Sequence, residues 1–225
     1  SADLGPFRVL WERHTEFARF TFIVGGAGAR PFAAPAIDAV PADWLAALPG
    51  RVLLATHTEF LPDPGGTPDW DRLGAEAFAG NPLVGAQVAG GKGTAITDFR
   101  IHADGWGRLL VYDGLAPRQA GRMLQRLLEI DAYRMLALLA FPVARQLGPL
   151  IAASERELAE VTTLLAAEAG RNEPELLDRL TRLQATIESR EAESHYRFGA
   201  AAAYYELVQR RIAEPRETRI ESLPT

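Results

Sequence analysis

The chain contains no cysteine among its 225 residues. This absence excludes a disulfide framework, a thiol nucleophile and a thiolate-ligated metal site. The chain also lacks an excess of basic residues, because its formal net charge is −5 at pH 7. Non-specific binding of nucleic acid depends on a positive field, so we expect no nucleic-acid partner.

Long apolar runs are also scarce. The longest, residues 135–144, is closed on its two sides by Arg134 and Arg145 and contains Pro142. A helix needs roughly 20 apolar residues to cross a bilayer, and this run is much shorter. We therefore expect the chain itself to be soluble.

The first half of the chain has the pattern of strands. Residues 7–12 and 17–24 are rich in β-branched and aromatic residues with partial alternation, and residues 51–60 form a third such segment. Residues 94–102 and 108–112 flank Asp104-Gly105, a pair that favours a tight hairpin. Short helices are expected from Pro41 and from Asp69 onward.

After Gly114 the apolar spacing changes to that of helices. The pattern predicts helices over about residues 115–147, 149–169 and 173–213, and Pro142 should end or kink the first of them. The third has a near-heptad apolar stripe, which is typical of an antiparallel helical hairpin or a coiled coil.

The fold class that follows is α+β. Residues 1–114 are expected to form a mostly antiparallel or mixed sheet of five or six strands with short helices, and residues 115–225 a helical region.

One candidate metal site rests on a repeated tetrapeptide. His14 and Glu16 stand in the same His-Thr-Glu-Phe string as His57 and Glu59. Residues two apart in a strand share a face, so paired strands would present imidazoles and carboxylates that suit zinc or another divalent ion, with His102 as a further donor. The alternative is two strand ends whose His and Glu side chains face solvent or form local hydrogen bonds.

Asp98, Arg100 and His102 alternate within the predicted hairpin strand. An acid, a guanidinium and an imidazole on one face suit proton transfer in a hydrolase, or anion binding. The alternatives are a solvated sheet face with an Asp–Arg pair, or a face covered by the following helix. No nucleophile accompanies these residues.

A candidate anion site lies at the start of the first long helix. Arg118, Arg122 and Arg126 are spaced i, i+4, i+8, and positive charge near a helix N-terminus opposes the macrodipole. An anion bound with help from Arg100 would offset this unfavourable interaction with the helix dipole, and so would internal carboxylates. The available carboxylates are Asp98, Asp104, Glu129 and Asp131.

No nucleotide motif is complete. Lys92 follows two glycines, but Gly93 stands where a phosphate-binding loop requires Ser or Thr. We therefore expect no cofactor.

Several strings resemble a bacterial family of unknown function whose members are described as membrane-anchored. The resemblance covers nearly the whole chain. It is carried by residues 3–8 with 11–17, 97–102 with Asp104-Gly105, 118–122 running into 125–131 and 133–139, and Arg197-Phe198 with 203–208.

The resemblance implies an N-terminal segment before Ser1, further helix after Thr225, and a hydrophobic C-terminal anchor that is absent from this chain. It implies association with a membrane, on its cytoplasmic face. The chain departs from the family pattern at Pro215, where an apolar helical residue is expected. The family has no established activity, so the resemblance supplies no catalytic residues.

Three functions are consistent with these observations. The first is a non-enzymatic, membrane-tethered scaffold or assembly module that forms homo-oligomers through its helices. The second is a regulatory domain of an ion-transport protein that senses a divalent metal or an anion. The third is a hydrolase that uses Asp98 and His102.

Overall fold

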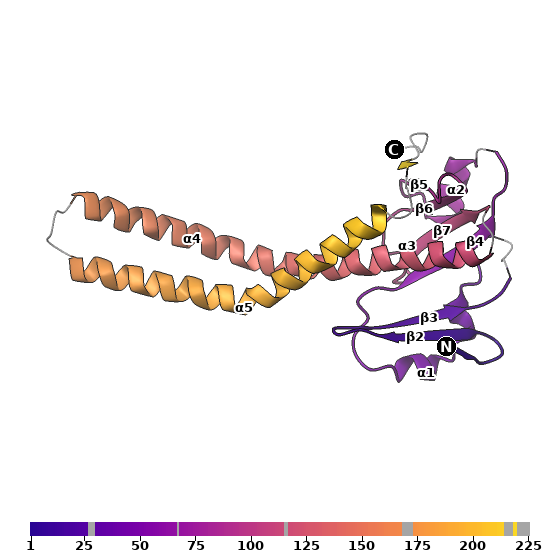
Figure 1. The fold of residues 1–225 in the computed structure, drawn as a ribbon, viewed down its shortest axis with the longest axis horizontal. Coiled ribbons are helices and arrows are strands. Elements are labelled where there is room, and N and C mark those ends of the chain that lie inside the picture. The colour runs from indigo at the N-terminus through magenta and orange to yellow at the C-terminus, as the bar shows by residue number, and fades with distance from the viewer. Residues whose placement is uncertain (27–29, 67, 115–116, 168–172, 214–217, 220–225) are drawn as a thin grey trace. The chain divides into compact units, whose positions relative to one another are not determined.

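The computed structural model describes residues 1–26, 30–66, 68–114, 117–167, 173–213 and 218–219. The chain divides into two compact units. Unit 1 consists of Ser1–Arg126 with Ile212–Thr225, and unit 2 of Leu127–Arg211. Strands with short helices come first and long helices follow (Figure 1), so the predicted α+β class is confirmed.

A small antiparallel sheet opens unit 1. It consists of β1 (Ala2–Asp3), β2 (Arg8–Arg13) and β3 (Ala18–Ile23), in that order. Trp44, from the predicted short helix α1 (Ala42–Ala46), packs edge-on against Phe20 and Phe22 of β3. These aromatic contacts explain how a short sheet gains a packed face.

The second sheet of unit 1 has the order β4-β7-β6-β5-β8. Most of its pairs are antiparallel, but β4 pairs with β7 in parallel. The single sheet expected from the sequence is therefore two sheets, and the predicted strand 51–60 begins later, at Thr56. The strands are β4 (Thr56–Pro62), β5 (Val84–Val88), β6 (Gly93–Thr97), β7 (Gly107–Asp113) and β8 (Thr218–Arg219).

The core of unit 1 lies against helix α2 (Trp70–Ala77). Asp69 caps this helix, because its side chain accepts a hydrogen bond of 3.0 Å from the backbone N–H of Arg72. The short 3-10 helix η1 (Ala36–Ala39) precedes α1. The core side chains are Leu73, Ala77, Phe78, Leu83, Ile96 and Leu110.

The two strands of the predicted hairpin pair with each other, but residues 98–106 separate them, so the connection is longer than the tight turn that was predicted, and the first strand was predicted too long. β6 ends at Thr97, and Phe99 turns the chain with a φ of 51°. The loop closes where the N–H of His102 donates to the carbonyl of Trp106 (2.9 Å), and Gly105 has a φ of 84°. Glycine adopts this left-handed conformation without steric cost, so the Asp104-Gly105 signal located the turn correctly.

The helices begin and end partly where the sequence predicted. α3 (Pro117–Leu138) and α4 (Ala140–Ala167) separate at Leu139, not near residue 148, and α5 covers Glu173–Ala213 as predicted. Pro142 stands in the first turn of α4, where a missing backbone N–H breaks no helical hydrogen bond. Of the residues after Ala213, the structure describes Thr218 and Arg219, which form β8.

Unit 2 is an antiparallel helical hairpin. Arg211 of α5 contacts Glu129 of α3 at 2.7 Å, Tyr204 stacks on Tyr133, and Arg179 lies 3.2 Å from Glu160 of α4. These contacts show that α5 runs antiparallel to α3 and α4. The side chains buried within it include Val161, Leu176, Leu183, Ser194 and Val208.

Candidate functional site

Some of the side chains singled out in the sequence come together in unit 1, around His57 of β4. The imidazole of His57 stacks on the indole of Trp106, with ring centroids 4.3 Å apart and 5° between the planes. Its Nε2 lies 3.7 Å from Oδ2 of Asp104, and a guanidinium nitrogen of Arg108 lies 3.6 Å from the same oxygen. Arg108 also donates to the carbonyl of Ala77.

Burial decides the charge state of His57. Desolvation lowers its pKa below the ordinary value of 6.5, because the attraction of Asp104 only partly compensates and Arg108 repels the proton. For Asp104, partial burial raises the pKa, but the N–H of Trp106 and the positive charges of His57 and Arg108 outweigh it, so the net shift is downward. The pair therefore favours a neutral imidazole beside an ionised carboxylate at pH 7.

A second His–Asp pair holds the loop between β6 and β7. Nε2 of His102 lies 2.9 Å from Oδ2 of Asp98, and the exposed fractions of these side chains are 4% and 0%. Asn81 donates to Oδ2 of Asp98 at 2.8 Å, and the backbone N–H of Arg100 donates to Oδ1 at 3.2 Å. A buried carboxylate with this many donors is a structural tie. We name Asn81, Asp98 and His102 the loop clamp.

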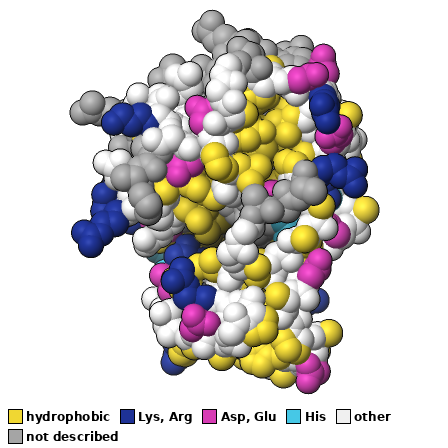
Figure 2. Space-filling model, turned by 90° about the vertical axis from the view of Figure 1, so that its right-hand side faces the viewer, with side chains coloured by type: hydrophobic (Ala, Val, Ile, Leu, Met, Phe, Trp, Pro, Cys, Tyr) yellow, Lys and Arg dark blue, Asp and Glu magenta, His cyan; other side chains and the backbone are white. Residues whose placement is uncertain are grey.

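The loop clamp presents two hydrophobic side chains to solvent. Phe99 is 54% exposed and Ile101 is 73% exposed. Phe99 keeps its positive φ because Asp98, the residue before it, is fixed by the clamp. On the face that Figure 2 shows, little histidine surface (cyan) is visible among the hydrophobic (yellow) and charged side chains.

The predicted metal ligands are distributed over both sheets. His14 lies between β2 and β3 and stacks on Phe17, with centroids 4.2 Å apart. Glu59 of β4 accepts a hydrogen bond from the N–H of Phe32 at 2.9 Å, and Glu16 is half-buried. Among the residues that the structure describes, no three His, Asp or Glu side chains are placed to hold a metal ion.

The predicted anion-binding arginines lie on two elements. Arg118 and Arg122 are exposed on the first turns of α3, and Arg126 is half-buried there. Arg100 is exposed in the β6–β7 loop, after the strand to which the sequence assigned it. The expected row of Asp98, Arg100 and His102 on one strand face is therefore absent, because the chain turns at Phe99.

Sequence reasoning missed Asn81, Trp106 and Arg108 as members of these clusters. The string 104–108 held a usable signal, because it places the indole of Trp106 and the guanidinium of Arg108 within four residues of Asp104. Asn81 carries no such signal, since only the folded chain brings it to Asp98.

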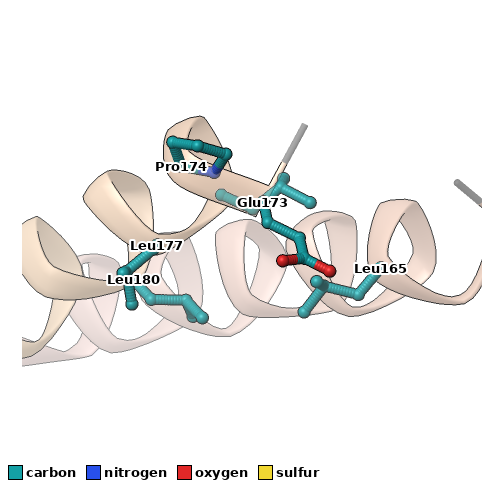
Figure 3. A pocket seen from close by; sticks show the side chains of 6 residues that line it. Leu165, Glu173, Pro174, Leu177 and Leu180 are labelled. Atoms are coloured by element: carbon teal, nitrogen blue, oxygen red, sulfur yellow. The ribbon is translucent and has the colours of Figure 1, made fainter. Parts of the chain in front are cut away.

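Unit 2 offers a site of another kind. Large hydrophobic side chains remain exposed on α4, among them Ile151 at 55%, Leu158 at 48% and Leu165 at 46%. An open apolar pocket of about 430 Å³ lies where α4 ends and α5 begins, and it is lined mainly by leucines of these two helices (Figure 3). The lining residues are Leu165, Glu173, Pro174, Leu176, Leu177 and Leu180.

One helical stretch, Arg118–Ala167, is long and apolar enough to cross a membrane by length and composition alone. It extends beyond Arg145, the charged residue that closes the longest uninterrupted apolar run in the sequence.

No curated protein and no solved structure was found to match this chain. A match to a family was found, and it extends over residues 1–225. It agrees with the resemblance seen in the sequence. The chain belongs to the family described as "Protein of unknown function (DUF3422)".

Proposed function

We propose that this chain is a non-enzymatic assembly module that associates with further copies of itself through unit 2, in a protein that is tethered to a membrane. The observation that carries the proposal is the hydrophobic surface of the helical hairpin. Its exposed large side chains are Leu138, Phe141, Leu150, Ile151, Leu158, Leu164, Leu165, Leu177, Ile187, Tyr196, Phe198 and Tyr205.

Such a surface favours association. Single exposed hydrophobic side chains are ordinary on soluble proteins, but extended apolar surface is typical of interaction sites. Two helices packed only on each other leave the flanks of their seam open to solvent. A bundle of more helices covers these flanks.

The membrane tether is supported by the resemblance to membrane-anchored proteins. We propose that the anchor lies in sequence outside this chain. Full-length protein should then sediment with membranes, whereas residues 1–225 should stay in the supernatant. Recovery of both in the supernatant would contradict the tether.

Sedimentation velocity over a wide range of concentrations tests self-association. We expect the sedimentation coefficient of residues 1–225 to rise with concentration. A coefficient that fits a monomer at the highest concentration would contradict the assembly function.

No specific observation favours the other two functions over this one. A hydrolase needs Asp98 and His102 within reach of substrate, and both side chains are buried in the loop clamp. A metal sensor needs convergent ligands, and the described residues form no group of three. The polar clusters of unit 1 are accounted for by the loop that they hold.

A further inference from the structure

We propose that two copies of this chain pair antiparallel along α4, with Ile151 of each copy at the two-fold axis. This inference rests on the self-association proposed above and names the surface and the orientation. The surface is a strip of four residues on α4, Ala144, Ile151, Leu158 and Leu165, which we call the α4 strip.

The spacing of the α4 strip suits a helix as partner. Its residues follow each other at intervals of seven and therefore lie almost in line along α4. All four are exposed, although Val161, on the neighbouring line, is 1% exposed and lies within the hairpin. Apolar residues that repeat every seven positions form one of the two lines of a coiled-coil seam.

A bilayer is the obvious competing occupant, because residues 135–154 contain a single charged residue, Arg145. The packing of α5 argues against it. Tyr133 lies against Tyr204, and Glu160 against Arg179. Residues 133–160 therefore run alongside residues 179–204 of α5.

The α5 segment that runs alongside the apolar stretch is strongly charged. A helix inserted in hydrocarbon would carry these charges with it, at a high cost in free energy. A second copy covers α4 and leaves this face of α5 in water. The charged residues are Glu188, Arg190, Glu191, Glu193 and Arg197.

Side-chain size and charge select the antiparallel orientation. With Ile151 on the axis, Leu158 of each copy lies level with Ala144 of the other, so large residues meet small ones. Arg145 of each copy then lies level with Glu157 of the other copy, and Glu155 lies within one helical turn of that level. A parallel pair would set Arg145 level with Arg145 of the other copy, which costs charge repulsion.

The area indicates a reversible complex. With Ile151 on the axis, the two strips overlap from Ala144 to Leu158, which is roughly 20 Å of helix with a width of about 10 Å. The overlapping parts bury on the order of 400–700 Å² together, which is below the range of stable specific interfaces. We therefore expect a dimer that dissociates on dilution.

The absence of cysteine allows a direct test by oxidation of single-cysteine variants of the 225-residue chain. Ile151→Cys should form a disulfide-linked dimer at least about fivefold faster than Leu158→Cys. Ala153→Cys, an exposed position on another side of α4, is the matched control and should react as slowly as Leu158→Cys. A mixture of Ala144→Cys and Leu158→Cys should give the mixed dimer.

The outcomes separate this inference from the proposed function. Self-association in sedimentation with equal cross-linking of all three single variants would overturn the α4 pairing and leave the assembly function standing. Fast self-linking of Leu158→Cys would overturn the antiparallel orientation. A strictly monomeric chain would overturn both proposals.

A charged substitution provides a second readout. Ile151→Glu should weaken dimerisation at least about tenfold, whereas Tyr205→Glu, at a residue of α5 that is 60% exposed, should not. Flotation with vesicles of phosphatidylcholine and phosphatidylglycerol tests the competing occupant. Binding of the wild-type chain to these vesicles, abolished by Ile151→Glu, would overturn the pairing in favour of lipid.

Discussion

At the scale of single residues, the two His–Asp pairs of unit 1 behave differently toward protons and toward mutation. His57 lies beside Asp104 but also beside Arg108, and burial keeps its pKa below the ordinary value. Asp98 is fully buried and joined to Asn81 as well as His102. The first pair predicts a dependence of stability on pH, and the second predicts a large loss of stability on truncation.

His57 should make unit 1 less stable in mild acid. The unfolded imidazole binds a proton near pH 6.5, whereas the folded one binds it only at lower pH. The unfolded state therefore holds more protons as the pH falls below that value, and the free energy of unfolding decreases. Urea unfolding at about pH 7.5 and about pH 5.5 measures this, because both values bracket the ordinary histidine pKa.

The matched variant is His57→Gln, which has no proton to bind. Its loss of stability between these two pH values should be smaller than that of the wild type. The other three histidines are present in both proteins, so the difference isolates His57. Equal losses would show that burial does not suppress protonation of His57.

Truncation of Asp98 should destabilise unit 1 strongly. Asp98→Ala leaves the amide of Asn81 and the backbone N–H of Arg100 without their acceptor, and it removes the carboxylate that lies 2.9 Å from the imidazole of His102. Loss of one member of a buried pair costs about 3–5 kcal/mol. Asp98→Asn keeps the shape and should cost less. The control is Asp71→Ala on the exposed side of α2, which should change stability by no more than about 0.5 kcal/mol. Equal effects of Asp98→Ala and Asp71→Ala in urea unfolding would disprove the clamp.

At the scale of elements, the helical hairpin of unit 2 separates buried from exposed leucines within one helix. Leu183 is 7% exposed and Leu177 is 65% exposed, and both lie on α5. The same substitution at the two positions therefore tests which side of α5 packs against α4.

Leu183→Ala should lower the stability of unit 2 by about 3 kcal/mol, because it removes buried apolar surface and leaves a cavity. Leu177→Ala should cost no more than about 0.5 kcal/mol. Amide hydrogen exchange along α4 and α5 measures the two variants. Similar acceleration of exchange in both would mean that Leu183 does not face α4.

At the scale of the whole molecule, self-association should appear as a dependence of thermal stability on concentration. Only the folded chain presents the α4 strip, so dimerisation stabilises the native state by mass action. The melting temperature of residues 1–225 should rise by a few degrees over about a hundredfold increase in concentration. Differential scanning fluorimetry measures this rise.

Ile151→Glu serves as the control for that experiment. Its melting temperature should stay constant over the same range of concentration, because a buried charge opposes dimerisation. A wild-type melting temperature that does not change with concentration would argue that folding and association are not coupled.

Local patterns in the sequence were sufficient for much of the fold. The strands at residues 8–13 and 18–23, the turn at Asp104-Gly105 and the helix at 173–213 all lie within a residue or two of their predictions. These elements depend on periodicity and on the backbone preference of glycine, which act over a few residues. The change of period after Gly114 likewise separated the strands from the long helices.

The candidate sites depended on contacts that no local pattern encodes. Asp98 meets His102 only because Phe99 reverses the strand, and Asn81 reaches Asp98 from another segment. His14 and His57 share a tetrapeptide, yet they belong to different sheets. Identical short strings therefore gave no information on spatial proximity.

The sequence by itself determined which segments form strands and which form helices, because steric preferences and apolar spacing act between residues close together in the chain. Only the tertiary structure decided that β4 pairs with β7 in parallel, which carboxylates are buried beside imidazoles, and which leucines of α4 stay exposed. Burial depends on segments far apart in the chain that arrive at one place. The function that we propose rests on these exposed leucines, and so on the fold rather than on a motif.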